Sequence, residues 1–350
     1  MITVVITSYN HAHYLPIQLA SIIRQGASVS RIIVVNDGST DDTADVLAKI
    51  QLNEPRLMVK NLTENVGWMQ AAHIGLRYVE TDFFALTAAD DFLMPDWAEK
   101  SLNAIQSAPD IGLCLSRTFT INETSDALSK TVIPKRLRGN ILTPQEFHHS
   151  LMQYGPWFTS NTTLYRRSAY DETELQFGSA SAFADGLTII VLGLKAGAVV
   201  VDEPLGVFFV REGSVSSGIV APQVGVTIIQ EASNILARPL CMELIDRRLA
   251  SRIVRRETYV CLLGAGRYLT SEFSQFAERI LPPIASRALR ISLRLLFILF
   301  KLMVFVCLRP FDFMVARRSF TDAATLDETR AFYEYQKVLN ESLPSIGLDI

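Results

Sequence analysis

Short apolar runs alternate with amphipathic segments along the first hundred residues. Runs rich in branched and aromatic side chains predict buried strands at 2–6, 31–35, 56–62 and 83–87. The amphipathic segments between them predict helices at 14–25, 42–51 and 68–78. Continuously apolar strands that alternate with helices are typical of a mostly parallel sheet with helices on both faces. The pattern therefore predicts an α/β fold.

The pattern becomes mixed after residue 110. Strands are predicted at 113–119, 162–166, 199–201 and 205–210, and helices at 144–152 and 183–196. From about residue 219 the chain has the pattern of helices to its end. We therefore expect two parts, an α/β domain over 1–217 and a helical region over 218–350.

Polar residues follow each of the four predicted parallel strands. They are Thr7, Ser8, Tyr9 and Asn10, then Asn36, Asp37 and Gly38, then Asn65 and Gly67, and finally Asp90 and Asp91. Ligands of such sheets bind at the carboxyl ends of the strands. Turn formation alone could account for any one of these clusters. Four clusters at one edge favour a binding site.

Two of these clusters suggest specific chemistry. The Asp37 carboxylate could accept an N–H from a nucleotide base such as uracil, although an Asx turn or helix cap is the simpler alternative. Asp90 and Asp91 offer the hard oxygen ligands with which Mg²⁺ and Mn²⁺ bind a diphosphate. The alternative is a cap on the helix that begins near Pro95.

Composition and charge narrow the class of protein. Hydrophobic residues make up 49% of the chain and charged residues 20%, which excludes a disordered chain and leaves an apolar excess to be placed. A net charge of −3 argues against general nucleic-acid binding. The four cysteines are far apart, so neither a zinc site nor a disulfide framework is expected. The N-terminus lacks the pattern of a signal peptide.

The motifs, in their order and spacing, resemble glycosyltransferase family 2. The resemblance is carried by 5–10, 34–43, 65–67 and 89–96, and it continues at 161–167, 184–186 and 202–205. It covers about 1–217 and implies an A-type glycosyltransferase fold with inverting transfer from a nucleotide-sugar. The string 36–43, Asn-Asp-Gly-Ser-Thr-Asp-Asp-Thr, is its most specific part.

The resemblance implies a role for each matching residue. Asp185 would be the general base, Asp90 the ligand of Mn²⁺ or Mg²⁺, and Asp91 a support for the sugar-phosphate. The remaining nucleotide and donor contacts would come from Thr7, Ser8, Tyr9, Asn10, Asp37, Asn65, Gly67 and Arg211. In this scheme Asp37 and Thr7 to Tyr9 line the base pocket, and Arg211 meets the phosphate in place of a histidine common in the family.

Several positions depart from the family's pattern. Ala88 stands where an Asp is common, and Ala184 replaces the Glu that often precedes the base. Ala72 and His73 stand where the family often has Arg-Asn. Fewer charged ligands would weaken metal binding. These losses leave the base, the base-pocket Asp and one metal Asp, and therefore favour an active enzyme over a silent nucleotide-sugar binding module.

The apolar excess is concentrated near the C-terminus. Fifteen of the eighteen residues 291–308 are apolar, and 285–318 contains seven basic residues and one acidic residue, a net of +6. Basic residues from Arg287 to Arg309 fall on one narrow stripe of a helix over about 285–309. This favours a helix lying in an anionic membrane surface. The alternatives are packing in a helical subdomain or at a homo-oligomer seam, and a true span.

Together these observations predict a cytoplasmic enzyme peripheral to the inner face of the cell membrane. It would move a sugar from a nucleotide-sugar, with UDP as the expected nucleotide, to a hydroxyl of a lipid-linked saccharide in cell-surface polysaccharide synthesis. The alternatives are the silent binding module and a membrane-surface adaptor whose polar turns are only caps.

Overall fold

The computed structural model describes residues 1–122, 127–173, 184–210, 222–256, 258, 261 and 321–348. The chain forms two compact units. The first comprises 1–180, 184–209 and 320–350, and the second comprises 181–183 and 210–319. All described residues of the candidate site belong to the first unit.

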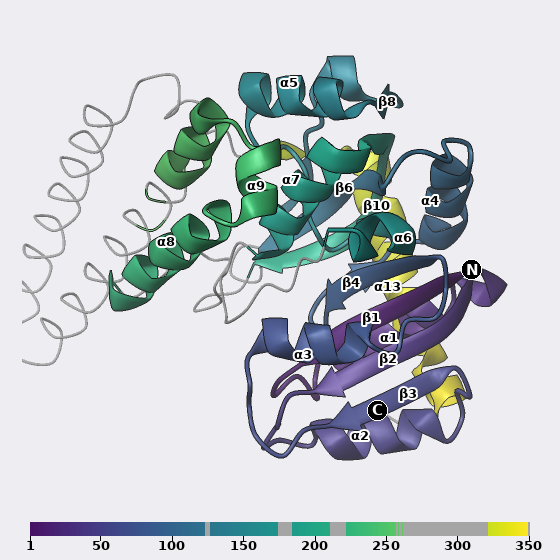
Figure 1. The fold of residues 1–350 in the computed structure, drawn as a ribbon. Helices are drawn as coiled ribbons and strands as arrows, with labels where there is room; N and C mark the ends of the chain where they lie inside the picture. The colour runs from purple at the N-terminus through teal and green to yellow at the C-terminus, as the bar shows by residue number, and fades with distance from the viewer. Residues whose placement is uncertain are drawn as a thin grey trace, which may run out of the picture. The chain divides into compact units, whose positions relative to one another are not determined.

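Four parallel strands form one half of the sheet in the first unit. In spatial order they are β4 (Phe83–Ala88), β1 (Ile2–Ser8), β2 (Val29–Asn36) and β3 (Leu57–Asn61). From β1 the chain moves to β2 and β3 on one side and then returns to β4 on the other side (Figure 1). Each observed strand lies within three residues of its predicted bounds.

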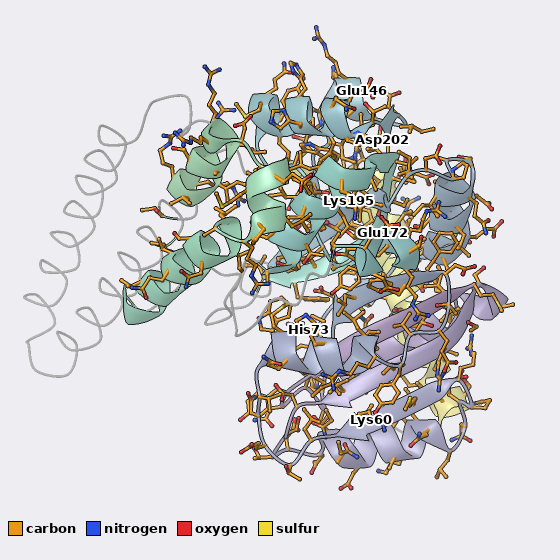
Figure 2. The ribbon with its side chains drawn as sticks, in the orientation of Figure 1. Lys60, His73, Glu146, Glu172, Lys195 and Asp202 are labelled. Atoms are coloured by element: carbon orange, nitrogen blue, oxygen red, sulfur yellow. The ribbon has the colours of Figure 1, made fainter. Side chains whose placement is uncertain are left out.

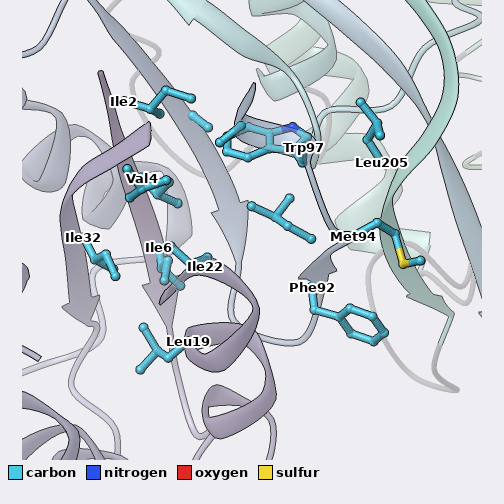
Figure 3. Packing of buried hydrophobic residues seen from close by; sticks show 14 of the residues in the cluster. Ile2, Val4, Ile6, Leu19, Ile22, Ile32, Phe92, Met94, Trp97 and Leu205 are labelled. Atoms are coloured by element: carbon cyan, nitrogen blue, oxygen red, sulfur yellow. The ribbon is translucent and has the colours of Figure 1, made fainter. Parts of the chain in front are cut away.

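Helices bury both faces of these strands, as their continuous apolar runs require. On one face α3 (Trp68–Leu76) packs closely, since a Cβ on its Gly75 would lie 2.5 Å from Val5 Cγ1. On the other face α1 (Leu15–Ile23) buries Leu19 and Ile22 in the same cluster as Val4 and Ile6 of β1 (Figure 3). Helix α2 (Thr43–Gln51) packs beside β3.

Antiparallel strands extend the sheet beyond β4. Next to β4 come β9 (Leu164–Arg166), β6 (Leu113–Asn122), β7 (Ala127–Thr131) and β11 (Thr321–Ala323). The long strand β10 (Ala198–Val210) pairs with β6 and with two short strands, β5 (Phe92–Leu93) and β8 (Ile141–Leu142). The pattern had predicted β10 as two strands, because Asp202, Glu203 and Pro204 interrupt its apolar run.

The helices of this half lie between these strands in the chain. They are α4 (Trp97–Gln106), α5 (Pro144–Tyr154), α6 (Arg167–Asp171) and α7 (Ala184–Ala196), with a short 3₁₀ turn η1 (Gly26–Ser28) before β2 and another, η2 (Lys135–Leu137), before β8. Helix α5 begins with a capping box, in which Thr143 accepts from the Glu146 N–H and the Glu146 carboxylate accepts from Thr143.

The C-terminal end of the chain returns to the first unit. Strand β11 adds to the edge at β7, and α13 (Leu326–Ser342) and the 3₁₀ turn η4 (Leu343–Ile346) pack against α1. Helix α13 buries Phe332 and Leu339 in the main core. Our expectation of helices from 219 to the end, separate from the α/β domain, differs from this arrangement, because an apolar face on α13 completes the core.

The second unit is helical where it is described. It contains α8 (Pro222–Leu236), α9 (Pro239–Leu244) and a further helical stretch over 247–256. The predicted membrane-surface helix over about 285–309 lies outside the described residues. Among the helices that the structure does describe, none combines the length and the apolar character needed to cross a bilayer.

Candidate active site

The topology predicts a ligand site at the carboxyl ends of β1 and β4. These two strands are neighbours, but the chain leaves β1 in one direction and β4 in the other, which makes this edge a topological switch point. Thr7, near the end of β1, lies between Val35 of β2 and Ala88 of β4. The predicted clusters after β1 and β4 therefore meet at one edge.

The loops after β1 and β2 are fastened to each other by side-chain to backbone hydrogen bonds. The Asn10 N–H donates to Ser39 Oγ at 2.9 Å, and Asn10 Oδ1 accepts from the Thr40 N–H at 2.8 Å. The Ala12 N–H donates to Asp41 Oδ2 at 3.1 Å. Asn10 has a positive φ of 55°, which asparagine tolerates better than most residues. These bonds give the two loops one fixed shape.

Asp37 is a buried carboxylate that accepts two backbone N–H groups. Its Oδ1 accepts from Val66 at 2.7 Å and its Oδ2 accepts from Gly67 at 3.0 Å. Asp37 is 2% exposed. The sequence predicted Asp37 as an acceptor of a base N–H, which stays a prediction; in the structure its donors are backbone N–H groups of the loop after β3. Asp37 thus joins the ends of β2 and β3.

Two glycines make this junction possible. A Cβ at Gly38 would lie 2.4 Å from the carbonyl carbon of Glu64, and its φ is +67°. Gly67, with φ 88°, precedes α3 and gives the N–H that Asp37 and the side chain of Asn65 share. Both residues therefore serve the close approach of two loops, since only glycine adopts these angles without strain.

The acidic turn, Asp90 and Asp91, follows β4 at this edge. Asp91 is buried, and its Oδ1 accepts from the Phe209 N–H of β10 at 3.3 Å. Asp90 is half-buried. Within the described ranges, no three His, Cys, Asp or Glu side chains lie close enough to hold a metal ion between them. Of the described residues, Asp90 and Asp91 are the carboxylates of this turn that could meet a divalent ion.

Asp185 occupies the first turn of α7. The residue is half-buried, but its carboxyl group lies inside the protein. Oδ2 accepts from Ser160 Oγ at 2.5 Å, and Oδ1 accepts from the Gly186 N–H at 2.7 Å. Burial raises the pKa of Asp185 above its ordinary value, and these hydrogen bonds oppose the rise only in part. A carboxylate tuned upward in this way is suited to accept a proton.

Strand β10 links the acidic turn to the surroundings of Asp185. Phe209 of this strand donates to Asp91, and two residues earlier the Val207 carbonyl accepts from Asn161 Nδ2 at 3.2 Å. The next residue back along the chain from Asn161 is Ser160, which donates to Asp185. Asp91, predicted to support the sugar-phosphate, and Asp185, predicted as the base, are therefore linked through β10 and the segment 160–161.

Thr7, Ser8 and Tyr9, at the end of β1, differ in how far they are exposed. Ser8 is buried, and its Oγ forms no hydrogen bond with any described residue. Tyr9 is 42% exposed and Thr7 is half-buried, so both reach the surface beside Asp37. Arg211 lies outside the described residues, and its predicted phosphate contact stays a prediction.

Two polar residues of α1, which were not predicted from the sequence, position the acidic turn. Gln18 Nε2 donates to Thr87 Oγ1 at 3.0 Å and to the Ala88 carbonyl at 2.9 Å. Ser21 Oγ accepts from the Leu93 N–H at 3.1 Å. Both side chains are fully buried. Their three-residue spacing on the apolar face of a predicted helix was the signal that could have found them.

Other residues of the matching segments hold the fold around the site. Asp202 of β10, labelled in Figure 2, pairs with the buried Arg117 of β6 at 2.5 Å, and Glu203 pairs with Lys100 at 2.6 Å. Trp157, an aromatic near Asn161, is buried and donates to Ser150 Oγ. It is a core residue, and it offers no exposed platform for a ligand.

Comparison with known proteins identifies the family of the domain that carries this edge of the sheet. Residues 3–173 match the model of the family Glycosyl transferase family 2. The chain contains a family 2 glycosyltransferase domain. The match includes every described site residue except Asp185, which follows the matched range.

The chain is also similar to individual glycosyltransferases, both in sequence and in solved structure. An uncharacterized glycosyltransferase of Haemophilus influenzae is 27% identical over 186 residues, which cover 53% of this chain and 57% of the relative. The chain thus spans little more than half of that relative. The structure of Staphylococcus aureus TarS 1–349 with UDP-GlcNAc has a TM-score of 0.53 at 18% identity and covers 83% of this chain and 88% of its own.

A second solved structure gives the same fold. The mannosyltransferase PcManGT of Pyrobaculum calidifontis, in complex with GDP-Man and Mn²⁺, has a TM-score of 0.52 at 16% identity and covers 90% of this chain and 85% of its own. At these identities the likeness concerns the fold alone. The predicted A-type glycosyltransferase fold, with a helical C-terminal region, is confirmed.

Proposed function

We propose that this protein is an inverting glycosyltransferase that uses a nucleotide-sugar. The observation that carries the proposal is that a family 2 domain holds both the acidic turn and Asp185, a carboxyl group of raised pKa, and that β10 contacts the acidic turn and the neighbour of Ser160, which donates to Asp185. A silent binding module would not need a base with a raised pKa. A membrane adaptor would need neither group.

In the proposed reaction Asp185 accepts the proton of an acceptor hydroxyl. The hydroxyl oxygen forms a bond to the anomeric carbon, and the bond from that carbon to the nucleoside diphosphate breaks on the opposite face. One displacement inverts the anomeric configuration. Ser160 and the Gly186 N–H hold the carboxylate of Asp185 in one orientation for this step.

We further propose that Asp90 and Asp91 hold Mn²⁺ or Mg²⁺ together with the donor diphosphate. Two adjacent carboxylates fit such an ion, because these metals are commonly bound by one or two carboxylates plus phosphate oxygens and water. When bound, the ion would neutralise the charge that develops on the departing diphosphate. Asp91 keeps its orientation through the Phe209 N–H.

We propose UDP as the nucleotide of the donor, with the residues from Thr7 to Asn10 and Asp37, Asn65 and Gly67 beside it. TarS was solved with UDP-GlcNAc, which supports UDP, whereas the mannosyltransferase was solved with GDP-Man. Both Asp37 oxygens already accept backbone N–H groups, but a carboxylate can accept more than one bond at each oxygen.

A donor screen tests this proposal. The full chain with Mn²⁺ is assayed for nucleotide release from UDP-, GDP- and dTDP-sugars, with and without EDTA. We expect release from a UDP-sugar that EDTA abolishes and that excess Mn²⁺ restores. The Asp90→Asn, Asp91→Asn double variant is the control and should stay inactive after Mn²⁺ is restored. Nucleotide binding without turnover on any donor would favour the silent module.

The acceptor class is proposed from the C-terminal sequence. A basic apolar helix over about 285–309 would hold the enzyme at an anionic membrane surface, on the cytoplasmic side. A lipid-linked saccharide of cell-surface polysaccharide synthesis is the acceptor that such a position would reach.

Vesicle flotation tests the membrane contact. We expect the full chain to float with vesicles that contain anionic lipid. Arg290→Glu, Arg294→Glu should weaken binding by more than about thirtyfold, since each basic residue near such a surface contributes about 1 kcal/mol and each introduced glutamate is also repelled. Lys135→Glu, Arg136→Glu, an equal charge change at exposed positions of the first unit, should bind as the parent does. Equal loss in both variants would refute a specific helix. Binding unchanged in both, with a dimer in solution, would favour an oligomer seam.

Charge reversal is preferable to truncation in this test. A deletion from 285 to the end would also remove β11 and α13, which belong to the first unit. Loss of membrane binding by such a deletion could then reflect unfolding of the catalytic domain.

A further inference from the structure

Three aromatic rings lie together behind the acidic turn. Phe92 directly follows Asp91, and its ring centroid lies 5.9 Å from that of Phe209 and 5.9 Å from that of Phe332. The rings of Phe92 and Phe332 are near parallel, at 22°. Phe92 and Phe332 are fully buried. Two of these rings belong to residues that set the position of the Asp91 carboxylate, since Phe209 also gives it an N–H.

The third ring comes from the far end of the chain. Phe332 lies on α13, and its ring also meets Phe119 of β6, with centroids 6.0 Å apart. The strand that follows the acidic turn, β5, has only two residues, Phe92 and Leu93. So short a strand has little pairing of its own to hold it. The ring of Phe332 is therefore one of the contacts that fix Phe92, beside β10 and α1.

Helix α13 is itself firmly anchored. Its first turn forms a capping box between Thr325 and Glu328. The Glu328 carboxylate also accepts from Lys130 Nζ of β7 at 2.6 Å and 2.7 Å, in a pair that is mostly shielded from solvent. Strand β11 pairs with the same strand β7 just before the helix. The helix thus presents Phe332 from a fixed position on the sheet.

We propose that Phe332 is a positioning residue for Asp91, and that α13 is the element through which the C-terminal part of the chain sets the geometry of the acidic turn. The proposal rests on the proposed function for its catalytic consequence. The ring holds Phe92 on one side of the carboxylate and lies in the same cluster as Phe209, the donor to that carboxylate, on the other.

The chain order connects both the strand of Phe209 and the helix of Phe332 to the segment 211–320. The sequence between β10 and β11, residues 211–320, enters from the strand that carries Phe209 and returns through the strand that leads into α13. One end of that segment is therefore attached to β10, which donates to Asp91, and the other leads into α13, whose Phe332 contacts Phe92.

The experiment compares Phe332→Leu with Leu339→Val in the full chain. Both changes remove a similar volume from buried positions on the same face of α13, seven residues apart, but Leu339 is two turns further from the acidic turn. Amide hydrogen exchange is followed in peptides covering 88–94 and 205–210. Half-saturating Mn²⁺ and kcat are measured with the donor found in the screen.

We expect Phe332→Leu to speed exchange in both peptides and to raise half-saturating Mn²⁺ by about tenfold, as loss of outer support for a metal ligand commonly does. Its kcat at saturating Mn²⁺ should fall less. Leu339→Val should lower the melting temperature to a similar degree and change neither exchange nor Mn²⁺ dependence. Equal effects of the two variants, or unchanged exchange with Phe332→Leu, would overturn the role of Phe332. The exchange result decides this even if no donor is turned over, which would instead refute the proposed function.

Discussion

Asp185→Asn is expected to lower kcat for sugar transfer by about 10²–10⁴-fold while donor binding is kept, because it removes the group that accepts the proton. The asparagine keeps the size of the side chain: its Oδ1 can accept from the Gly186 N–H, and its Nδ2 can donate to Ser160 Oγ. Initial rates and nucleotide binding by calorimetry provide the two measurements. Full turnover by the variant would exclude Asp185 as the base.

The raised pKa of Asp185 also predicts how activity changes with pH. Burial raises the pKa of Asp185, so activity should fall as the pH is lowered through that raised value, where the base becomes protonated. Ser160→Ala removes a hydrogen bond that favours the charged form, and it should move this limb to higher pH with kcat retained at high pH. An unmoved limb in Ser160→Ala would assign the titration to another group.

The raised pKa of Asp185 should also make the stability of the fold depend on pH. A carboxyl group whose folded-state pKa is raised stabilises the fold fully only below its unfolded pKa, and this contribution is lost as the pH rises through the folded value. Asp185→Asn should therefore raise the melting temperature relative to the parent at neutral pH and leave the difference small near pH 4. A base that weakens the fold at its working pH is what a functional site predicts.

Asp37→Ala is expected to be the most destabilising change at the site, by about 3 kcal/mol, and to abolish nucleotide binding. Two backbone N–H groups, of Val66 and Gly67, would lose a charged acceptor. Urea unfolding measures the first effect and calorimetric titration with UDP the second. Asp45→Asn, on the exposed side of α2, is the control for loss of one negative charge and should change neither.

Binding and stability separate the two possible roles of Asp37. Loss of stability with UDP affinity unchanged would leave Asp37 a joint between loops and remove it from the nucleotide site. Unchanged stability would contradict the hydrogen bonds that the structure gives it.

The parallel half of the fold could be predicted because its signals are local. The apolar runs of β1, β2, β3 and β4 are uninterrupted and are separated by helical segments, so pattern and structure agree closely. The short strands β5, β8 and β11 have two or three residues each, too few for any periodicity. They exist because β10 or β7 pairs with them.

The place of α13 could not be read from the chain for a related reason. Its apolar residues, including Phe332 and Leu339, recur at helical spacing and predict an amphipathic helix, but nothing local names the surface that the apolar face covers. A sequence interval of more than two hundred residues separates Phe332 from Phe92. Only the tertiary structure brings the two together.

The chemistry at Asp37 illustrates the same limit within the site. The sequence predicted Asp37, at the end of β2, as an acceptor of a nucleotide-base N–H. In the structure the donors are backbone groups of the loop after β3, because two glycines let that loop come close. The residue type shows that Asp37 can accept N–H groups. Which N–H groups reach its carboxylate depends on the tertiary structure.

Because α13 buries its apolar face in the main core, the first unit can complete its core only late in translation. The core around Phe92 and Phe119 cannot close until residues 326–342 have been made. At about 5–20 residues per second, translation of the 132 residues from the end of β10 to the end of α13 (342 − 210) takes roughly 7 to 26 seconds. During that interval the nascent chain exposes an apolar surface for chaperones, while residues 211–320 emerge ahead of the finished enzyme.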